Sequence, residues 1–225
     1  MRAHAAPAAA PRERRARRYT ARRFSPGQRV ARLSFSFPLA LTAAAALGAA
    51  HAFSFAPWNL WWLQLAALAA LFTLASRSAS ARDAAQLGGM FGLAWFGIGV
   101  SWVYISMHTY GGMPALLAGA AAAAFCAFLA LYPALALGVA ARWRGHAPTH
   151  LLIALPACWA LSEWLRGVVF TGFPWLASGY AHADGPLAGF APLAGVYGIS
   201  LIAAWVAGAA MRCATECASR EATSS

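Results

Sequence analysis

The amino-acid sequence predicts an all-α fold, a polytopic transmembrane bundle of about six helices. Of its 225 residues, 61% are hydrophobic and only 10% are charged, whereas ordinary soluble domains have roughly 45–50% apolar and about 25% charged residues. Apolar runs approaching the ~20 residues needed to cross a bilayer follow one another along the chain, separated by short polar breaks. Composition and patterning together exclude an ordinary soluble fold.

The apolar runs predict where each helix lies. The expected helices cover residues 33–50, 58–75, 84–106, 114–141, 150–165 and 191–211. The fifth is the shortest and contains Pro156, which a membrane helix tolerates when its neighbours satisfy the freed backbone groups. In the third, Gly88, Gly92, Gly97 and Gly99 predict close approach to a neighbouring helix, because small residues allow backbones to meet.

These helices divide the chain into a basic leader (1–32), a transmembrane domain (33–211) and a short polar tail (212–225). The leader holds ten of the seventeen arginines in a polar, low-complexity stretch, which predicts a disordered cytoplasmic segment. Arg22 and Arg23 before an apolar run also fit an export signal, but the apolar segments that follow favour a membrane anchor. The net charge of +11 is therefore local, and we expect no nucleic-acid partner.

The arginines also predict the orientation, because positive residues near helix ends favour the cytoplasmic side. With the N-terminus inside, sixteen arginines fall in cytoplasmic segments, and only Arg166 falls outside. This asymmetry supports the helix count. It predicts that residues 167–190, the longest external segment, face the exterior or periplasm.

Two charges near the end of the fifth helix are candidates for a functional site. Glu163 and Arg166 are spaced i, i+3 and so share one helix face. Ionisable residues within a membrane helix are functional candidates because burying them is costly. A structural pair at the membrane interface explains the same residues, and both readings stay open.

The loop that follows combines glycine, proline and aromatic residues. Gly172 would let the backbone turn or approach another group, and Pro174 would restrict it. Phe173 and Trp175 could enter lipid or hold an acyl chain, and Tyr180 closes the stretch. An ordinary interfacial re-entrant turn is the alternative.

By themselves, the remaining reactive side chains indicate no catalytic, metal or cofactor site. Cys213 and Cys217 have helical spacing, but no further ligands join them, so we expect no metal. Ser101, Ser178 and Ser200 lack a plausible histidine and carboxylate partner on their side of the membrane. The histidines are scattered over loops on both sides. No phosphate-binding glycine motif occurs, and we expect no cofactor.

Short motifs along the membrane domain carry a family resemblance. They are HAFSFAP (51–57), SWVYIS (101–106), YGGMP (110–114), EWLRG (163–167), TGFPW (171–175), GY (179–180), DGPL (184–187) and APLAGVYG (191–198). In this order they resemble apolipoprotein N-acyltransferase over about residues 35–210. The resemblance implies a bacterial inner-membrane enzyme that moves an acyl chain from a phospholipid to the N-terminal cysteine of an apolipoprotein.

The resemblance also implies where the chemistry takes place. In this family a periplasmic nitrilase-like domain carries a Glu-Lys-Cys triad, whose cysteine forms a thioester, whose glutamate is the general base and whose lysine stabilises the oxyanion. Gly172 and Trp175 match loop positions that the family uses near the active-site opening, which implies substrate access or docking of the catalytic domain. The other residues of this matched stretch are Glu163, Arg166, Phe173, Pro174 and Tyr180.

This sequence departs from the family pattern after Met211, where it turns polar. It contains no lysine, so a triad that needs lysine cannot be assembled from it. We expect this chain alone to be inactive, being truncated, frameshifted or one part of a split enzyme with a separate catalytic domain as its partner. The competing class is a non-enzymatic integral membrane protein, either a transporter or a scaffold.

Overall fold

The computed structural model describes residues 36–145 and 149–224, so the predicted leader, residues 1–32, lies outside the described residues. Within them the chain is helical and contains no strand, which confirms the all-α prediction. The α-helices are α2 (Phe37–Ala52), α3 (Trp61–Arg77), α4 (Ala81–Gly99), α5 (Trp102–Ile105), α6 (Ala115–Ala140), α8 (Leu155–Val168) and α9 (Ala191–Ser224). Short 3₁₀ or π segments join them: η1 (Ser106–Tyr110), η2 (Ala141–Trp143), η3 (His150–Ala154), η4 (Val169–Thr171), η5 (Ser178–His182) and η6 (Pro186–Phe190).

Local sequence explains where helices begin. Pro38 lies in the first turn of α2, where its missing N–H has no intrahelical partner to lose. At the start of α4, the Ser80 hydroxyl accepts from the Asp83 N–H (3.1 Å), and the Asp83 carboxylate accepts from the Ser80 N–H (3.0 Å). This reciprocal pair satisfies two backbone donors that would otherwise be unpaired at the helix end.

Each of the six predicted segments contains a helix within the described residues, but the prediction of one continuous third helix is wrong. That segment breaks after Gly99 into α4 and a second piece, Trp102–Tyr110, and the two pieces are bent by 48°. Two glycines in the last turn of α4 lower its helix stability. At the break the Val103 N–H bonds to the Val100 carbonyl (2.9 Å), so the regular α-helical pattern is interrupted.

The sixth helix is longer than the apolar run predicts. α9 continues through the polar tail to Ser224, and it is kinked at Gly195, where φ is 61°. In the tail Arg212 Nε lies 2.8 Å from Glu216 Oε1, an i, i+4 ion pair. Pairs with this spacing stabilise a helix on its exposed surface.

Length and composition identify fewer membrane spans than the six predicted. Among the described helices, three are long and apolar enough to cross a membrane: Ala115–Trp143, His150–Thr171 and Pro186–Glu221. The bent pair of α4 and Trp102–Tyr110 makes a fourth if it counts as one span. α2 and α3 have 16 and 17 residues, fewer than the ~20 that span the hydrocarbon core.

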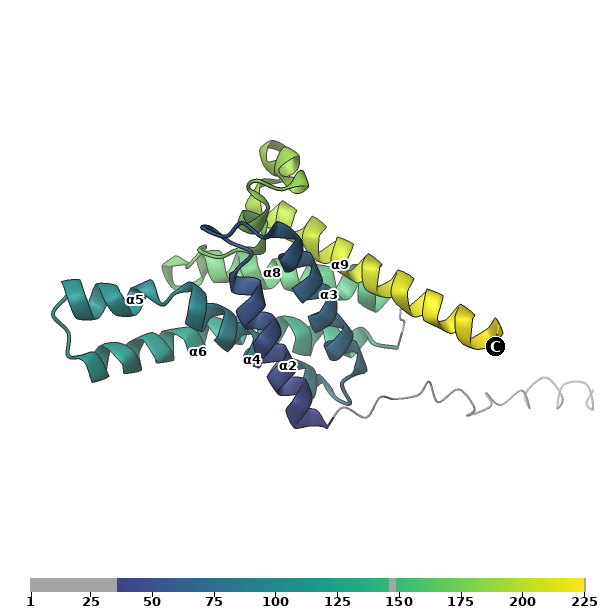
Figure 1. Cartoon of the computed structure of the whole chain (residues 1–225), viewed down its shortest axis with the longest axis horizontal. Helices are drawn as coiled ribbons and strands as arrows, with labels where there is room; N and C mark the ends of the chain where they lie inside the picture. The colour runs from purple at the N-terminus through teal and green to yellow at the C-terminus, as the bar shows by residue number, and fades with distance from the viewer. Residues whose placement is uncertain (1–35, 146–148, 225) are drawn as a thin grey trace, which may run out of the picture. The chain divides into compact units, whose positions relative to one another are not determined.

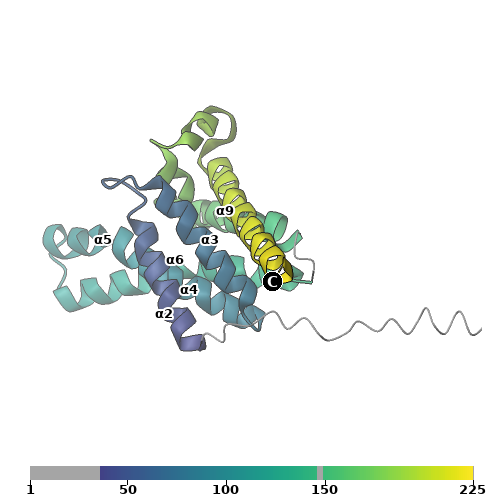
Figure 2. The same cartoon turned by 45° about the vertical axis from the view of Figure 1, so that its right-hand side comes forward.

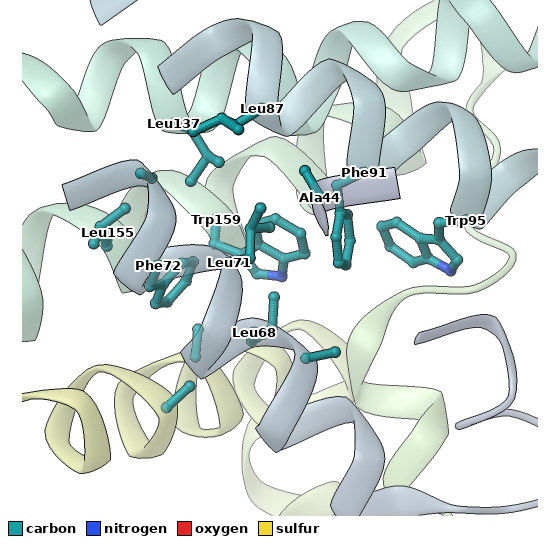
Figure 3. Close-up of a cluster of buried hydrophobic side chains, with 14 of the residues drawn as sticks. Ala44, Leu68, Leu71, Phe72, Leu87, Phe91, Trp95, Leu137, Leu155 and Trp159 are labelled. Atoms are coloured by element: carbon teal, nitrogen blue, oxygen red, sulfur yellow. The ribbon is translucent and has the colours of Figure 1, made fainter. Parts of the chain in front are cut away.

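The centre of the bundle is an aromatic cluster (Figure 3). Trp159 of α8 lies between Phe72 of α3 and two rings of α4, Phe91 and Trp95. The ring centroids are 5.9–6.1 Å from that of Trp159. All four side chains are at most 1% exposed. Aromatic rings at these separations contribute beyond their buried area, so α8 is anchored in the core immediately before its charged residues.

Glycines bring α4 against α6, and the two helices lie side by side in Figures 1 and 2. A Cβ added to Gly88 would lie 2.3 Å from the Pro133 carbonyl oxygen, and one on Gly92 would lie 2.6 Å from the Pro133 ring. The prediction of close helix approach is therefore confirmed for Gly88 and Gly92. It is wrong for Gly97, which has open space beside it, and Gly99 contacts a loop instead.

Polar contacts tie the connections together at each end of the bundle. Arg144 donates from Nη1 to the Ser78 carbonyl (2.8 Å) and from Nη2 to the Ser80 carbonyl (3.1 Å), which joins the end of α6 to the α3–α4 turn. A second contact starts from Asn59, which lies just before α3. Its side-chain Nδ2 donates to the Asp184 carboxylate (3.0 Å). The α2–α3 connection is thereby bound to the segment between α8 and α9.

Candidate functional site

The predicted loop between α8 and α9 has an irregular backbone. We call residues 169–180 the aromatic loop. Phe170, Thr171 and Leu176 have positive φ angles of 52°, 72° and 59°, and Gly172 has a φ of 81°. Non-glycine residues rarely adopt this left-handed region. Such a conformation persists only where surrounding contacts hold it.

The first of these contacts comes from Glu163. Its Oε1 accepts from the Ser178 N–H (3.0 Å) and from the Ser178 hydroxyl (2.6 Å), and its Oε2 also approaches the N–H (3.1 Å). Glu163 is 2% exposed and Ser178 is fully buried. Hydrogen bonds to a carboxylate are about twice as strong as neutral ones, so the end of the aromatic loop is held to α8.

Arg166 holds the middle of the aromatic loop. Its Nη1 donates to the backbone carbonyls of Phe173 (2.7 Å) and Trp175 (2.5 Å), while its own carbonyl accepts from the Phe173 N–H (2.7 Å). The guanidinium lies 5.7 Å from the Trp95 ring centroid and 5.2 Å from that of Phe96. At 2% exposure, it gains both charge-assisted hydrogen bonds and cation–π attraction.

Gly172 permits the turn between these two anchors. A Cβ at this position would lie 2.0 Å from the Gly167 carbonyl oxygen, and its φ of 81° disfavours any L side chain. Its N–H donates to the Val169 carbonyl (3.0 Å). The loop backbone therefore folds back onto the end of α8 at a point where only glycine fits.

The aromatic side chains divide between the interior and the surface. Phe173 packs edge-to-face on Phe125 of α6, with ring centroids 5.0 Å apart. Trp175 and Tyr180 are 55% and 51% exposed, and Phe170 is 82% exposed. A rigid backbone thus presents three large rings to the surroundings and one to the bundle. Pro174 separates the inward-facing Phe173 from the exposed Trp175 in the sequence. Its carbonyl accepts from the Ala177 N–H (3.3 Å).

A second layer of polar groups supports the buried end of the loop. The Trp159 indole N–H donates to the Ser178 hydroxyl (3.2 Å). The Ser200 hydroxyl of α9 accepts from the Gly179 N–H (2.9 Å) and donates to the Val196 carbonyl (3.1 Å). α8, the loop and α9 are therefore joined by one hydrogen-bonded chain.

The segment after the loop contacts α3. The ring of His182, in η5, lies 3.0 Å through Nε2 from the Gln64 side-chain oxygen, so this nitrogen carries the donor proton. Both side chains are fully buried. Burial lowers the pKa of His182, because the charged imidazolium is poorly solvated there.

The structure places the seven predicted site residues in the aromatic loop and the end of α8, where they make different contacts. Glu163 and Arg166 do not pair with each other within the described chain; each holds a separate part of the loop. Both are structural supports in this arrangement. The expectation that Ser178 lacks a carboxylate partner is wrong, because the bend of the loop returns it to Glu163. A fully buried hydroxyl bonded on both sides is nevertheless a structural link and not an exposed nucleophile.

Sequence reasoning missed three contributors, namely Trp159, Leu176 and Ser200. Trp159 could have been found, since it is spaced i, i+4 from Glu163 on the same helix face. The other two depend on loop geometry, which no local pattern predicts. In the described part of the chain, no group of three or more His, Cys, Asp or Glu side chains converges as metal ligands would. The arrangement as a whole presents an aromatic surface on a backbone that is held by buried polar groups.

Comparison with known proteins relates this architecture to one family. The apolipoprotein N-acyltransferase N-terminal domain matches residues 47–209. The apolipoprotein N-acyltransferase of Ralstonia nicotianae is 52% identical over 182 residues, covering 80% of this chain and 34% of its own length. That of Bordetella bronchiseptica is 48% identical over 182 residues, covering 73% of this chain and 33% of its own.

A third relative gives the same picture. The apolipoprotein N-acyltransferase of Nitrosomonas europaea is 47% identical over 172 residues, covering 74% of this chain and 35% of its own length. The chain spans about a third of the length of the curated relatives it matches. It belongs to the apolipoprotein N-acyltransferase family, which it matches through the family's N-terminal domain.

Proposed function

We propose that this chain is the membrane-embedded part of an enzyme that transfers an acyl chain from a phospholipid to the N-terminal cysteine of apolipoproteins. The match to the N-terminal domain over residues 47–209 carries this proposal. The acyl-transfer chemistry belongs to a nitrilase-like catalytic domain, on this chain's own extension or on a separate partner. Residues 1–225 contain no lysine, so they do not supply a Glu-Lys-Cys triad, and we expect them to be inactive by themselves.

The role proposed for the aromatic loop is to guide substrate or to dock the catalytic domain. Trp175 and Tyr180 face outward on a backbone held by Glu163 and Arg166. Exposed aromatic rings on a rigid support suit both a lipid surface and a protein interface, because each ring offers a large apolar area at little entropic cost. Gly172 gives the backbone its turn.

A chimera tests the function. Residues 36–211 of this chain replace the equivalent part of the Ralstonia nicotianae relative, which shares 52% identity, and N-acylation of a diacylated lipopeptide by phospholipid is measured in membranes. We expect the chimera to be active and this chain alone to be inactive. Turnover by the isolated chain, or a stably folded but inactive chimera, contradicts the proposal.

Matched tryptophans test the role of the loop within the chimera. Trp175 and Trp143 are similarly exposed, at 55% and 51%. Trp143 is not part of the aromatic loop and lies in η2, directly after the C-terminal end of α6. We expect Trp175→Ala to lower the acylation rate and Trp143→Ala to leave it close to that of the parent. Equal acylation rates in the two variants would show that the aromatic loop has no particular role in guiding substrate or docking the catalytic domain.

We also propose that the chain lies in the bacterial inner membrane with the aromatic loop on the periplasmic side. The arginines that flank the other helix ends support this orientation. An impermeant maleimide applied to intact spheroplasts should label Leu193→Cys, since Leu193 is 87% exposed near the loop. It should not label Cys213 and Cys217 on the C-terminal part of α9. The reverse pattern would invert the topology.

A further inference from the structure

The break between α4 and α5 lies beside Leu176 of the aromatic loop. A methyl group built on Gly99 would lie 2.3 Å from Cδ1 of Leu176 and 3.4 Å from its Cγ. Real Cβ atoms essentially never lie at the shorter separation. The Leu176 side chain therefore rests in a notch that any side chain at position 99 would fill.

Leu176 is held in that notch by its neighbours. Its backbone has a φ of 59°, and buried charges bind Trp175, the residue before it, and Ser178, two residues after it. The Trp175 carbonyl accepts from Arg166 (2.5 Å), and Ser178 donates to Glu163 (2.6 Å). Because these bonds fix the loop backbone, Leu176 cannot withdraw without disturbing them.

A groove lies beside the same break. Its volume is about 480 Å³, and its lining includes Gly97 of α4, Ser101 of the break, Tyr104 of α5, and Gly119 and Cys126 of α6. Gly97 faces open space, whereas Gly99 faces Leu176. Two residues of a 3.6-residue turn differ by roughly 200° in direction. Leu176 therefore presses on the side of the chain that faces away from the groove.

The piece beyond the break projects from the bundle. This arm, Trp102–Tyr110, runs outward beside the first part of α6 at the left of Figure 1. Trp102 is 45% exposed, Ile105 is 49% exposed and Tyr110 at its end is 84% exposed. Few side chains cover the arm, and the short connection 111–114 ties its far end to the start of α6. The angle at the break therefore affects how the near end of the arm diverges from α6, beside the groove.

We infer that Leu176 is a wedge that fixes the angle of the Trp102–Tyr110 arm and, through it, the width of the groove between the arm and α6. The charge-held loop and the groove are then mechanically coupled: a movement of the loop that lifts Leu176 from Gly99 releases the arm. This device is separate from acyl transfer, and it can be tested on the chain without any assay of activity.

Distances between spin labels test the wedge. The full chain is reconstituted in lipid nanodiscs in a background with Cys126→Ala, Cys158→Ala, Cys213→Ser and Cys217→Ser, and labels are placed on Leu39→Cys and Tyr110→Cys. These two sites are 51% and 84% exposed, and they report the position of the arm relative to α2. We expect Leu176→Ala to broaden the distance distribution and to add a population shifted from that of the parent. The matched control, Leu193→Ala, removes the same atoms from an 87% exposed leucine and should leave the distribution unchanged.

A double-mutant cycle separates the wedge from general loosening. Gly99→Ala alone forces a methyl group against Leu176 and should shift the arm. Gly97→Ala, its control, adds a methyl group to open space and should not shift it. In Gly99→Ala combined with Leu176→Ala, the new methyl group partly refills the notch, so the distribution should narrow towards that of the parent. Strictly additive effects overturn the inference, because residues in contact show coupling and independent ones do not.

A milder substitution covers the case in which Leu176→Ala does not fold. Leu176→Val shortens the side chain and keeps it apolar, so it should give a smaller broadening than Leu176→Ala. A distribution identical to that of the parent in every folded Leu176 variant overturns the inference.

Discussion

The carboxylate of Glu163 accepts hydrogen bonds from both the backbone N–H and the hydroxyl of Ser178, fifteen residues further along the chain. The contact closes the aromatic loop onto α8 within a buried environment. Its strength decides how rigid the loop is, and each of the following predictions concerns either this contact or another that holds the loop and its neighbours in place.

Removing the Glu163 carboxylate should destabilise the chain. Glu163→Ala leaves two buried donors of Ser178 unpaired, and hydrogen bonds to charged groups contribute about 1.5–3 kcal/mol. We expect the free energy of unfolding, measured by SDS titration in mixed micelles, to fall by about 2–3 kcal/mol. Glu163→Gln keeps one acceptor oxygen and should cost less.

An exposed glutamate provides the comparison for that measurement. The Glu216 side chain is 53% exposed and is paired with Arg212, and surface pairs are worth about 0–1 kcal/mol. Glu216→Ala should therefore change the free energy of unfolding much less than Glu163→Ala. Equal losses of unfolding free energy in the two variants would show that the contact between Glu163 and Ser178 stabilises the chain no more than an exposed ion pair does.

Replacing Arg166 with lysine should loosen the middle of the loop while preserving the charge. A lysine lacks the planar guanidinium that lies near the Trp95 and Phe96 rings and donates to two carbonyls from one nitrogen. We expect faster hydrogen exchange of the Ala177 and Ser178 amides in Arg166→Lys. Arg212→Lys, on the exposed part of α9, should leave exchange in the loop at the parent rate; a similar change there would contradict the role of Arg166.

Two glycines with positive φ separate backbone strain from steric clash. Gly112 has a φ of 67° and open space around it, whereas Gly172 has a φ of 81° and a carbonyl oxygen 2.0 Å from its would-be Cβ. Gly112→Ala should cost about 1–2 kcal/mol from conformation alone. Gly172→Ala should cost more, because the backbone of the loop must move. Thermal unfolding in detergent measures both losses of stability. Equal losses would mean that the backbone around the Gly167 carbonyl can move away from the added methyl group at no measurable cost.

Acidification should weaken the contact between η5 and α3. Burial lowers the pKa of His182 below its ordinary value of 6.5, so the unfolded chain binds the proton more readily than the folded one. Stability is then complete above that ordinary value and is lost as the pH falls below it towards the folded-state pKa. The charged ring would also carry a second donor at Nδ1, for which the described residues supply no partner.

The measurement is the difference in free energy of unfolding between about pH 7.5 and about pH 5.5. The difference should be smaller in His182→Gln than in the parent. In His108→Gln, which alters an exposed histidine, it should stay at the parent value. An unchanged pH dependence in His182→Gln would show that His182 does not titrate in this range.

Much of the fold could be predicted from the sequence, because apolar runs of sufficient length leave few alternatives to helices. The contact between Gly99 and Leu176 could not be predicted, since Leu176 lies seventy-seven positions later in the chain and has a left-handed backbone. The partners of Glu163 and Arg166 were hidden for the same reason. A sequence pattern records which residues share a helix face, and not where a loop returns.

Arg166 binds main-chain oxygens of Phe173 and Trp175, and every amino acid supplies such an oxygen at those positions. The side chains at 173 and 175 can consequently be exchanged without removing the bonds that hold them in place. The residue that holds the loop lies in α8, whereas the side chains that face the surroundings lie in the loop itself. The two sets of residues can therefore change independently. An aromatic surface built in this way can diverge to suit new neighbours while its anchor stays constant, and a library randomised at position 175 alone would sample contact preferences on an intact scaffold.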